Sequence, residues 1–238
     1  LADGQGLGAI QNDDLAPTLA FSTTNSVLEG NITADDRKVP FTVTLSAVSG
    51  VDVSGTISTS SGSATEGTDF VSVDSVAFVI PAGQTQATIL VSVIEDTTFE
   101  ADEQFTIDAA VSDPSTVSNN GGTATGTGTI ENDDAMPTLS IDDISLTEGV
   151  SGITAFTFTV TLSANPSSNV TVTVNTADGT TNPATTADND YSAISSLVLT
   201  FVPNGPLTQT VTVNVAGDGK FERDETFFVN LSSPPGAT

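Results

Sequence analysis

The sequence predicts an all-β chain that folds as two tandem antiparallel β-sandwiches. Apolar residues alternate with polar residues, mostly Thr, in residues 41–46, 156–163 and 211–215. A period of two, rich in β-branched side chains, is typical of half-buried strands with one face toward a core. Gly, Asn, Asp and Pro interrupt these runs at intervals of roughly eight to twelve residues, and no stretch has sustained helical periodicity. Each sandwich is expected to hold about seven antiparallel strands in two sheets.

The division into two sandwiches is predicted from an internal repeat with a period of about 120 residues. Four motifs occur twice, namely FTVTLS at 41–46 and 158–163, Glu-Gly at 29–30 and 148–149, FEADE or FERDE at 99–103 and 221–225, and IQNDD or IENDD at 10–14 and 130–134. A chain of 238 residues has room for two domains of roughly 100–120 residues.

The phase of the repeat gives the expected domain boundaries. Residues 1–14 match the last strand and the Asn-Asp-Asp end of a preceding repeat, residues 15–134 form the first domain, and residues 135–238 form a second domain that lacks its last strand. Because natural sheets avoid open edges, residues 7–11 are expected to pair beside residues 227–231 of a neighbouring copy. The copies would be joined covalently in a longer repeat protein, or by strand donation.

The charge balance limits the partners and the chemistry. The chain has 30 acidic and 4 basic residues, a formal net charge of −26, and no Cys, His or Trp. Nucleic-acid partners are excluded because phosphate binding needs clustered Lys and Arg. No apolar run is long enough to span a membrane. Missing Cys and His exclude the usual zinc, copper and haem sites and the Ser-His-Asp or Cys-His nucleophiles. Carboxylate oxygen remains, and calcium prefers it.

The motifs, taken in order, resemble a known domain family. The first copy contains SVLEG, FTVTLS, GTDF, IPAGQT, VIEDTTFEADE and TGTGTIENDD, and the second contains LTEG, TADGT, NDY, GDGKFERDE and NLSSP. This order resembles the Calx-beta domain, the immunoglobulin-like module of sodium–calcium exchanger regulatory loops and of large bacterial surface adhesins. The resemblance implies two tandem immunoglobulin-like sandwiches arranged head to tail.

The resemblance also implies calcium ligands, supplied by carboxylates that converge at one end of each sandwich. In the first copy the matching residues are Glu29, Glu95, Asp96, Glu100, Glu103, Asn132, Asp133 and Asp134. In the second copy they are Glu148, Asp178, Asp218, Glu222 and Glu225. Asp13 and Asp14, which close the segment at residues 10–14, are expected to approach the second cluster of a neighbouring copy.

Two departures from the family pattern limit the expected number of ions. The first copy has Ser61 where the second copy keeps Asp178, and the second copy has Gly217, Gly219 and Lys220 where the richest exchanger sites are acidic or apolar. Each site is therefore expected to hold one or two Ca²⁺ ions. The alternative is that these acidic residues are solvated loop charges without a metal.

The function predicted from these features is structural or adhesive and not enzymatic. Paired carboxylates also occur in glycosidases, but sugar sites nearly always supply aromatic platforms, and this chain has no Trp and a single Tyr, Tyr191. We expect an extracellular, calcium-stiffened rod or filament at the cell surface, whose partners are neighbouring copies of the unit and an unidentified surface or matrix ligand. The alternatives are a calcium-sensing regulatory domain pair of a larger, transporter-type protein, and a carbohydrate-binding module.

Overall fold

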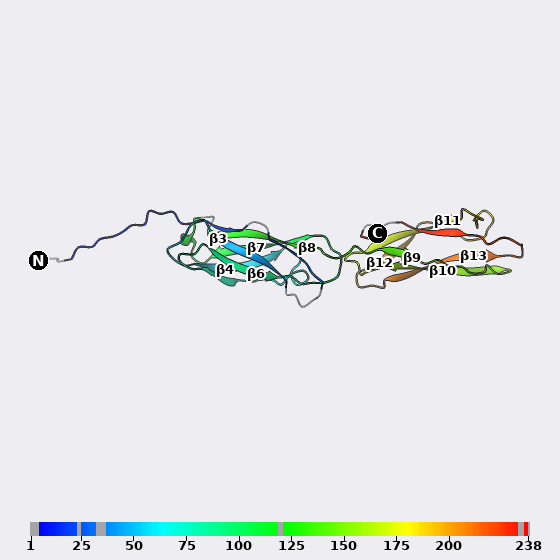
Figure 1. The fold of residues 1–238 in the computed structure, drawn as a ribbon, viewed down its shortest axis with the longest axis horizontal. Helices are drawn as coiled ribbons and strands as arrows, with labels where there is room; N and C mark the ends of the chain where they lie inside the picture. The colour runs from blue at the N-terminus through cyan, green and yellow to red at the C-terminus, as the bar shows by residue number, and fades with distance from the viewer. Residues whose placement is uncertain (1–4, 23–24, 32–36, 119–120, 233–235, 238) are drawn as a thin grey trace. The chain divides into compact units, whose positions relative to one another are not determined.

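The computed structural model describes residues 5–22, 25–31, 37–118, 121–232 and 236–237, and these residues form two compact units (Figure 1). One unit comprises Leu1–Thr97 and Ala101–Asp133, and the other comprises Thr98–Glu100 and Asp134–Thr238. Every described regular element is a strand except one short 3₁₀ turn, η1 (Pro114–Thr116). The all-β prediction is confirmed. No described helix is long and apolar enough to cross a membrane.

The first unit is a sandwich of a three-stranded and a five-stranded sheet. The smaller sheet has the order β1 (Leu19–Phe21), β3 (Lys38–Leu45) and β6 (Gln86–Ser92). The larger sheet has the order β2 (Asn25–Leu28), β8 (Thr123–Glu131), β7 (Glu103–Val111), β4 (Val53–Ser61) and β5 (Val76–Ile80). The expectation of antiparallel strands alone is wrong at one place, because β2 pairs with β8 in parallel. A parallel pair needs a long crossover, and here the whole domain between β2 and β8 supplies it.

The second unit has six described strands against eight in the first, in two three-stranded sheets. One sheet has the order β13 (Thr208–Gly217), β10 (Gly152–Leu162) and β9 (Leu139–Ile141). The other has the order β12 (Leu197–Phe201), β11 (Val170–Asp178) and β14 (Phe227–Leu231). In register, β11 and β14 correspond to β4 and β7, since Asp178 pairs with Phe227 as Ser61 pairs with Phe105. Among the described residues, no strand of this unit corresponds to β2 or β8.

Alternating strands build both cores. Phe41, Val43 and Leu45 of β3 are buried while the Thr residues between them face outward, as the period of two predicts. In the first unit Phe70 stacks on Phe105, with ring centroids 4.4 Å apart. In the second unit Tyr191 stacks on Phe227 in the same way, at 4.8 Å. Burial of one such aromatic side chain stabilises a fold by about 2–3 kcal/mol.

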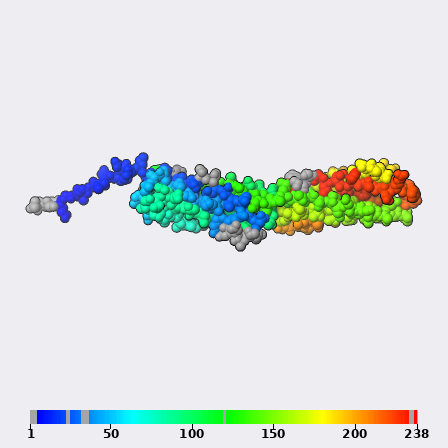
Figure 2. All heavy atoms as spheres, in the orientation of Figure 1, coloured from blue at the N-terminus to red at the C-terminus, as the bar shows by residue number. Residues whose placement is uncertain are grey.

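Residues 5–14 belong to no strand. Leu7 and Ile10 are fully exposed, so this segment does not pair with the first unit. Figure 2 draws it in dark blue with no other described part of the chain lying over it in this view. Its expected pairing with a neighbouring copy stays a prediction, because the structure describes one chain.

Candidate calcium sites

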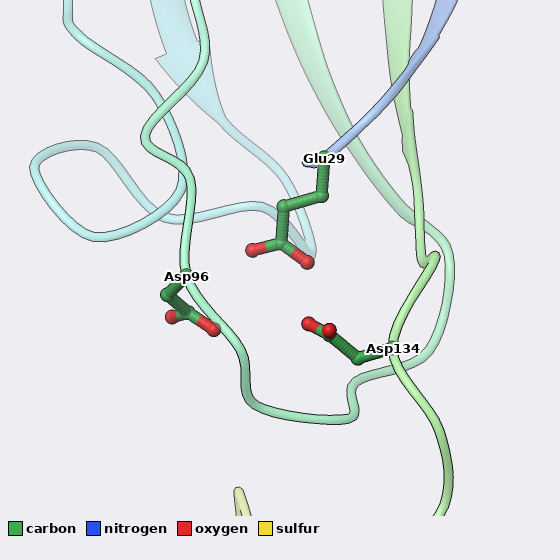
Figure 3. A group of neighbouring side chains, drawn as sticks. All are labelled: Glu29, Asp96 and Asp134. Atoms are coloured by element: carbon green, nitrogen blue, oxygen red, sulfur yellow. The ribbon is translucent and has the colours of Figure 1, made fainter. Parts of the chain in front are cut away.

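Three carboxylates of the calcium cluster expected in the first copy lie together. Glu29 directly follows β2, Asp96 lies in the loop after β6, and Asp134 lies three residues after β8. Each offers a carboxylate oxygen within 4.8 Å of the others, and Figure 3 shows the three carboxylates facing a common point. Glu29 is only 3% exposed, although an isolated buried carboxylate is costly. The sequence prediction placed these three residues in one cluster, and the structure brings them together.

The Glu-Gly motif explains how Glu29 reaches this position. Gly30 has a φ of +90°, in the left-handed region that favours glycine, and it ends the extended course of β2. The Gly30 amide donates to Asp133 Oδ1 at 3.0 Å, and the Glu29 amide donates to the Glu131 carbonyl at 2.8 Å. Gly149 repeats the turn after Glu148 with a φ of +95°. The motif therefore turns the chain and holds the carboxylate at the end of the sandwich.

A second acidic group in the first unit contains a residue that the sequence analysis missed. Asp69 lies with Glu100 and Glu103, again with one carboxylate oxygen from each within 4.8 Å of the others. Asp69 is 7% exposed, and its Oδ2 accepts from the Thr65 amide at 2.5 Å. The neighbouring Phe70 anchors this loop on Phe105 of β7. The Gly-Thr-Asp-Phe motif could have identified Asp69 as a candidate ligand, because an Asp beside a buried aromatic residue is held in place by the core.

The second unit has two acidic groups, one of which matches the group of Asp69, Glu100 and Glu103 position by position in the repeat. Glu148, Asp218 and Glu222 form one, and Asp190, Glu222 and Glu225 form the other. Asp190 corresponds to Asp69 and was also missed. Its Oδ2 accepts from the Thr185 amide at 2.7 Å, beside the buried Tyr191. The positional agreement between the units shows that the same loops collect carboxylates twice.

The electrostatics of the second unit show the repulsion that a cation would relieve. Burial raises the pKa of Glu225, and the charges of Asp190, Glu222, Glu148 and Asp188 raise it further. An ammonium already offsets part of this charge, because Lys220 Nζ lies 3.1 Å from Asp218 Oδ2 and 3.7 Å from Glu222 Oε1. The backbone hydrogen bond from Lys220, more than its charge, lowers the pKa of Asp218.

Some predicted ligands lie outside these groups. Asp178 Oδ1 accepts from the Tyr191 hydroxyl at 2.8 Å, which holds that ring in the core. Glu95 Oε1 lies 4.0 Å from Arg37 Nε. Asp133 accepts from Gly30, as described above, and Asp13 and Asp14 lie in the exposed segment before β1. Asp178, Glu95 and Asp133 belong to none of the four carboxylate groups found among the described residues.

The donor chemistry of all four groups fits calcium. Ca²⁺ takes six to eight oxygen ligands, and carboxylates bind it through one or both oxygens. Three carboxylates supply up to six oxygens, and water or backbone carbonyls complete such a shell. Because the chain has no Cys or His, softer metals that prefer sulfur or imidazole find no ligands here. In the first copy of the repeat the residues that would hold an ion are Glu29, Asp96 and Asp134 in one group, and Asp69, Glu100 and Glu103 in the other.

Comparisons with known proteins agree with this architecture. No curated protein matches the chain. Similar solved structures include CBD12 from CALX1.2, at 22% identity and a TM-score of 0.43 over 92% of this chain and 81% of that one. CBD12 of CALX1.1 has 23% identity and a TM-score of 0.41, over 91% of this chain and 79% of that one. The apo-form Calx CBD1 domain has 25% identity and a TM-score of 0.39, over 49% of this chain and 99% of that one. The Calx-beta domain family matches residues 13–135 and again residues 131–238, so the chain belongs to that family.

Proposed function

We propose that this chain is a calcium-binding structural repeat that acts without catalysis. The observation that carries the proposal is the group formed by Glu29, Asp96 and Asp134, in which a carboxylate that is 3% exposed lies within 4.8 Å of two others. Like charges held so closely disfavour the ionised state, whereas a divalent cation favours it. Glu148 and Asp218, which match Glu29 and Asp96 in the repeat, also lie in a group of three carboxylates, with Glu222, so the property belongs to the repeat and not to one loop.

The physical role of calcium would be to stabilise and stiffen the sandwich end. At about 1 mM free calcium and a Kd of about 0.1 mM, which is typical of extracellular modules, each occupied site adds about 1.4 kcal/mol to the free energy of unfolding. Bound calcium also relieves electrostatic repulsion within the chain, whose net charge is −26 without the metal.

We further propose that the repeat works outside the cell, as part of a rod or filament built from neighbouring copies. Two features support this. The four acidic groups suit the millimolar calcium of an extracellular medium better than the submicromolar calcium of a sensor, since each has only three carboxylates. The motif IQNDD at residues 10–14 also returns as IENDD at residues 130–134, which suits a unit that follows copies of itself along a rod.

Calorimetry tests the proposal. We expect calcium at 2 mM to raise the melting temperature by about 3–8 °C relative to EDTA, with NaCl added to match ionic strength. Glu29→Gln keeps the shape of the side chain but removes its charge, so the increase assigned to the first unit should disappear. Glu66→Gln is the matched control, because Glu66 is exposed and belongs to none of the four groups.

Coincident melting curves with calcium and with EDTA would overturn the metal function. A submicromolar Kd in a calcium titration would instead favour the regulatory, sensor-type alternative.

A further inference from the structure

The loop that carries Asp190 in the second unit spans residues 178–191. It begins at the last residue of β11 and ends at the buried Tyr191. The matching loop of the first unit spans residues 61–70 and begins at the last residue of β4. Residues 178–191 number 14 and residues 61–70 number 10, so the loop of the second unit loses more conformational entropy when it is ordered. The longer loop therefore needs additional bonds to hold a carboxylate in one place.

Both loops hold their carboxylate with the same kind of backbone bond. The Thr185 amide donates to Asp190 Oδ2 at 2.7 Å, and the first unit has the matching bond to Asp69. The first residue of each loop also accepts from an amide within the loop, at 3.3 Å for Asp178 and at 3.0 Å for Ser61. Up to this point the two loops are built alike.

The second unit adds a side-chain bond that joins the first and last residues of its loop. Asp178 Oδ1 accepts from the Tyr191 hydroxyl at 2.8 Å. A tyrosine hydroxyl keeps its proton at neutral pH, so it donates to the carboxylate in a charge-assisted hydrogen bond. The first unit has Ser61 and Phe70 at these two positions, and phenylalanine has no hydroxyl to donate. The carboxylate and the phenol therefore occur together in the longer loop, and the shorter loop has neither.

Tyr191 connects this bond to the core of the second unit. It is 5% exposed, and its ring stacks on Phe227 of β14 with centroids 4.8 Å apart. The preceding residue, Asp190, is held to β13, since its carbonyl accepts from the Ala216 amide at 2.8 Å. Because the ring is fixed, its hydroxyl holds Asp178, and with it the start of the loop, in a fixed place relative to Asp190.

We propose that Asp178 and Tyr191 form a clasp that positions Asp190 for calcium, and that Asp178 is a positioning residue and not a ligand. This inference rests on the proposed calcium function and refines the site in the second unit. Asp178 is in none of the carboxylate groups of the described residues, whereas Asp190 lies with Glu222 and Glu225. The resemblance to the Calx-beta family implies a ligand at Asp178, so the clasp gives that position a different role.

The position of Asp190 matters because carboxylates of the same charge must share one ion. Burial, followed by the charge of Asp190, raises the pKa of Glu225. The two carboxylates thus repel each other when no cation lies between them. A loop tied at both ends resists this repulsion, whereas a loose loop would let Asp190 move away and would have to return it on binding. Preorganisation of this kind raises affinity, because less ordering accompanies binding.

Terbium luminescence tests the clasp at the second unit alone. Tb³⁺ is a hard cation that takes oxygen ligands as Ca²⁺ does, and it emits when a nearby aromatic ring is excited. Tyr191 is the single Tyr of the chain, which has no Trp. Asp178→Asn keeps an acceptor for the hydroxyl but loses the charge, whereas Asp178→Ser supplies the residue of the first unit. The matched control for charge is Asp224→Asn, since Asp224 is exposed and lies in none of the four groups.

We expect Asp178→Asn to bind Tb³⁺ within about two-fold of Asp224→Asn, and Asp178→Ser to bind it about three- to ten-fold more weakly. If Asp178 were a ligand, its two variants would both weaken binding by similar, larger factors. That result, or equal affinities of all three variants, would overturn the inference. Calcium binding in calorimetry without luminescence through Tyr191 would also overturn it and leave the calcium function standing. If neither ion binds, the calcium function itself is wrong.

A second measurement separates positioning from general stability. Tyr191→Phe removes the hydroxyl and keeps a ring against Phe227, so calorimetric titration with calcium replaces the luminescence. We expect Tyr191→Phe to weaken calcium binding as Asp178→Ser does, and the double variant to bind no more weakly than either single variant. Additive losses would mean that the two residues act separately and would overturn the clasp. A lower melting temperature in EDTA with unchanged calcium affinity would overturn it as well, because the bond would then serve stability alone.

Discussion

Lys220 is the side chain that most clearly separates the acidic groups of the two units. Its ammonium lies between Asp218 and Glu222, whereas the first copy of the repeat has Thr98 at the matching position. A fixed positive charge competes with Ca²⁺ for the same carboxylates. We expect Lys220→Thr to tighten calcium binding by the second unit by a few-fold in a calorimetric titration.

The control for this prediction is Lys38→Thr, which removes the same formal charge from the first unit. Screening by 0.5 M NaCl should shrink the difference between wild type and Lys220→Thr, because the lysine is largely exposed. A weaker affinity after Lys220→Thr would show that the lysine positions the carboxylates instead of competing with the ion.

Some residues of the candidate calcium sites could be predicted from the sequence, and others could not. Glu29 and Glu148 were predicted because their Glu-Gly motifs match the Calx-beta family. Asp69 and Asp190 were missed, since their place beside the other carboxylates depends on the packing of Phe70 and Tyr191. The hydrogen bond that Asp178 accepts from the Tyr191 hydroxyl could not be predicted. Side-chain partners across a core cannot be derived from spacing alone.

Among the strands, β8 completes the larger sheet of the first unit. It joins β7 to β2 and brings Ile130 into the core. Gly128→Ala would place a Cβ 2.6 Å from the ring of Phe105, and the strand would have to shift. We expect a loss of about 1–3 kcal/mol in the free energy of unfolding of the first unit, measured by urea denaturation.

The matched control for this strand is Gly50→Ala. Gly50 has no heavy atom within 4 Å of a built Cβ and no positive φ, so the same substitution there should change the free energy of unfolding by less than about 0.5 kcal/mol. An equal effect of both substitutions would mean that glycine in β8 matters for chain entropy and not for close packing.

The strands that alternate strictly were predicted well, because burial of one face determines their register. The parallel pairing of β2 could not be predicted, because four residues carry too little pattern to give a direction. Residues 144–147 align with β2 in the repeat and form no described strand.

For the molecule as a whole, assembly of neighbouring copies and calcium binding should be coupled. Asp134 lies three residues after β8, with Glu29 and Asp96. In the proposed filament Asp14, which matches Asp134 in the repeat, would lie beside Glu148 and Asp218 of the next copy. Without calcium this carboxylate would meet others of the same charge, whereas with calcium it would complete the ligand set. Coupling of this kind is reciprocal, so calcium must strengthen assembly by the same factor as assembly strengthens calcium binding.

We expect the association constant from sedimentation equilibrium to be about ten-fold higher in 2 mM calcium than in EDTA at equal ionic strength. Asp14→Asn should remove most of this difference while leaving association in EDTA unchanged or slightly stronger, because it removes repulsion and a ligand together. Glu66→Gln, with the same change in net charge at an exposed site outside the groups, should keep the full calcium effect. If wild-type chains associate equally in calcium and in EDTA, assembly does not bring Asp14 to the second unit's carboxylates. The two binding events are then independent.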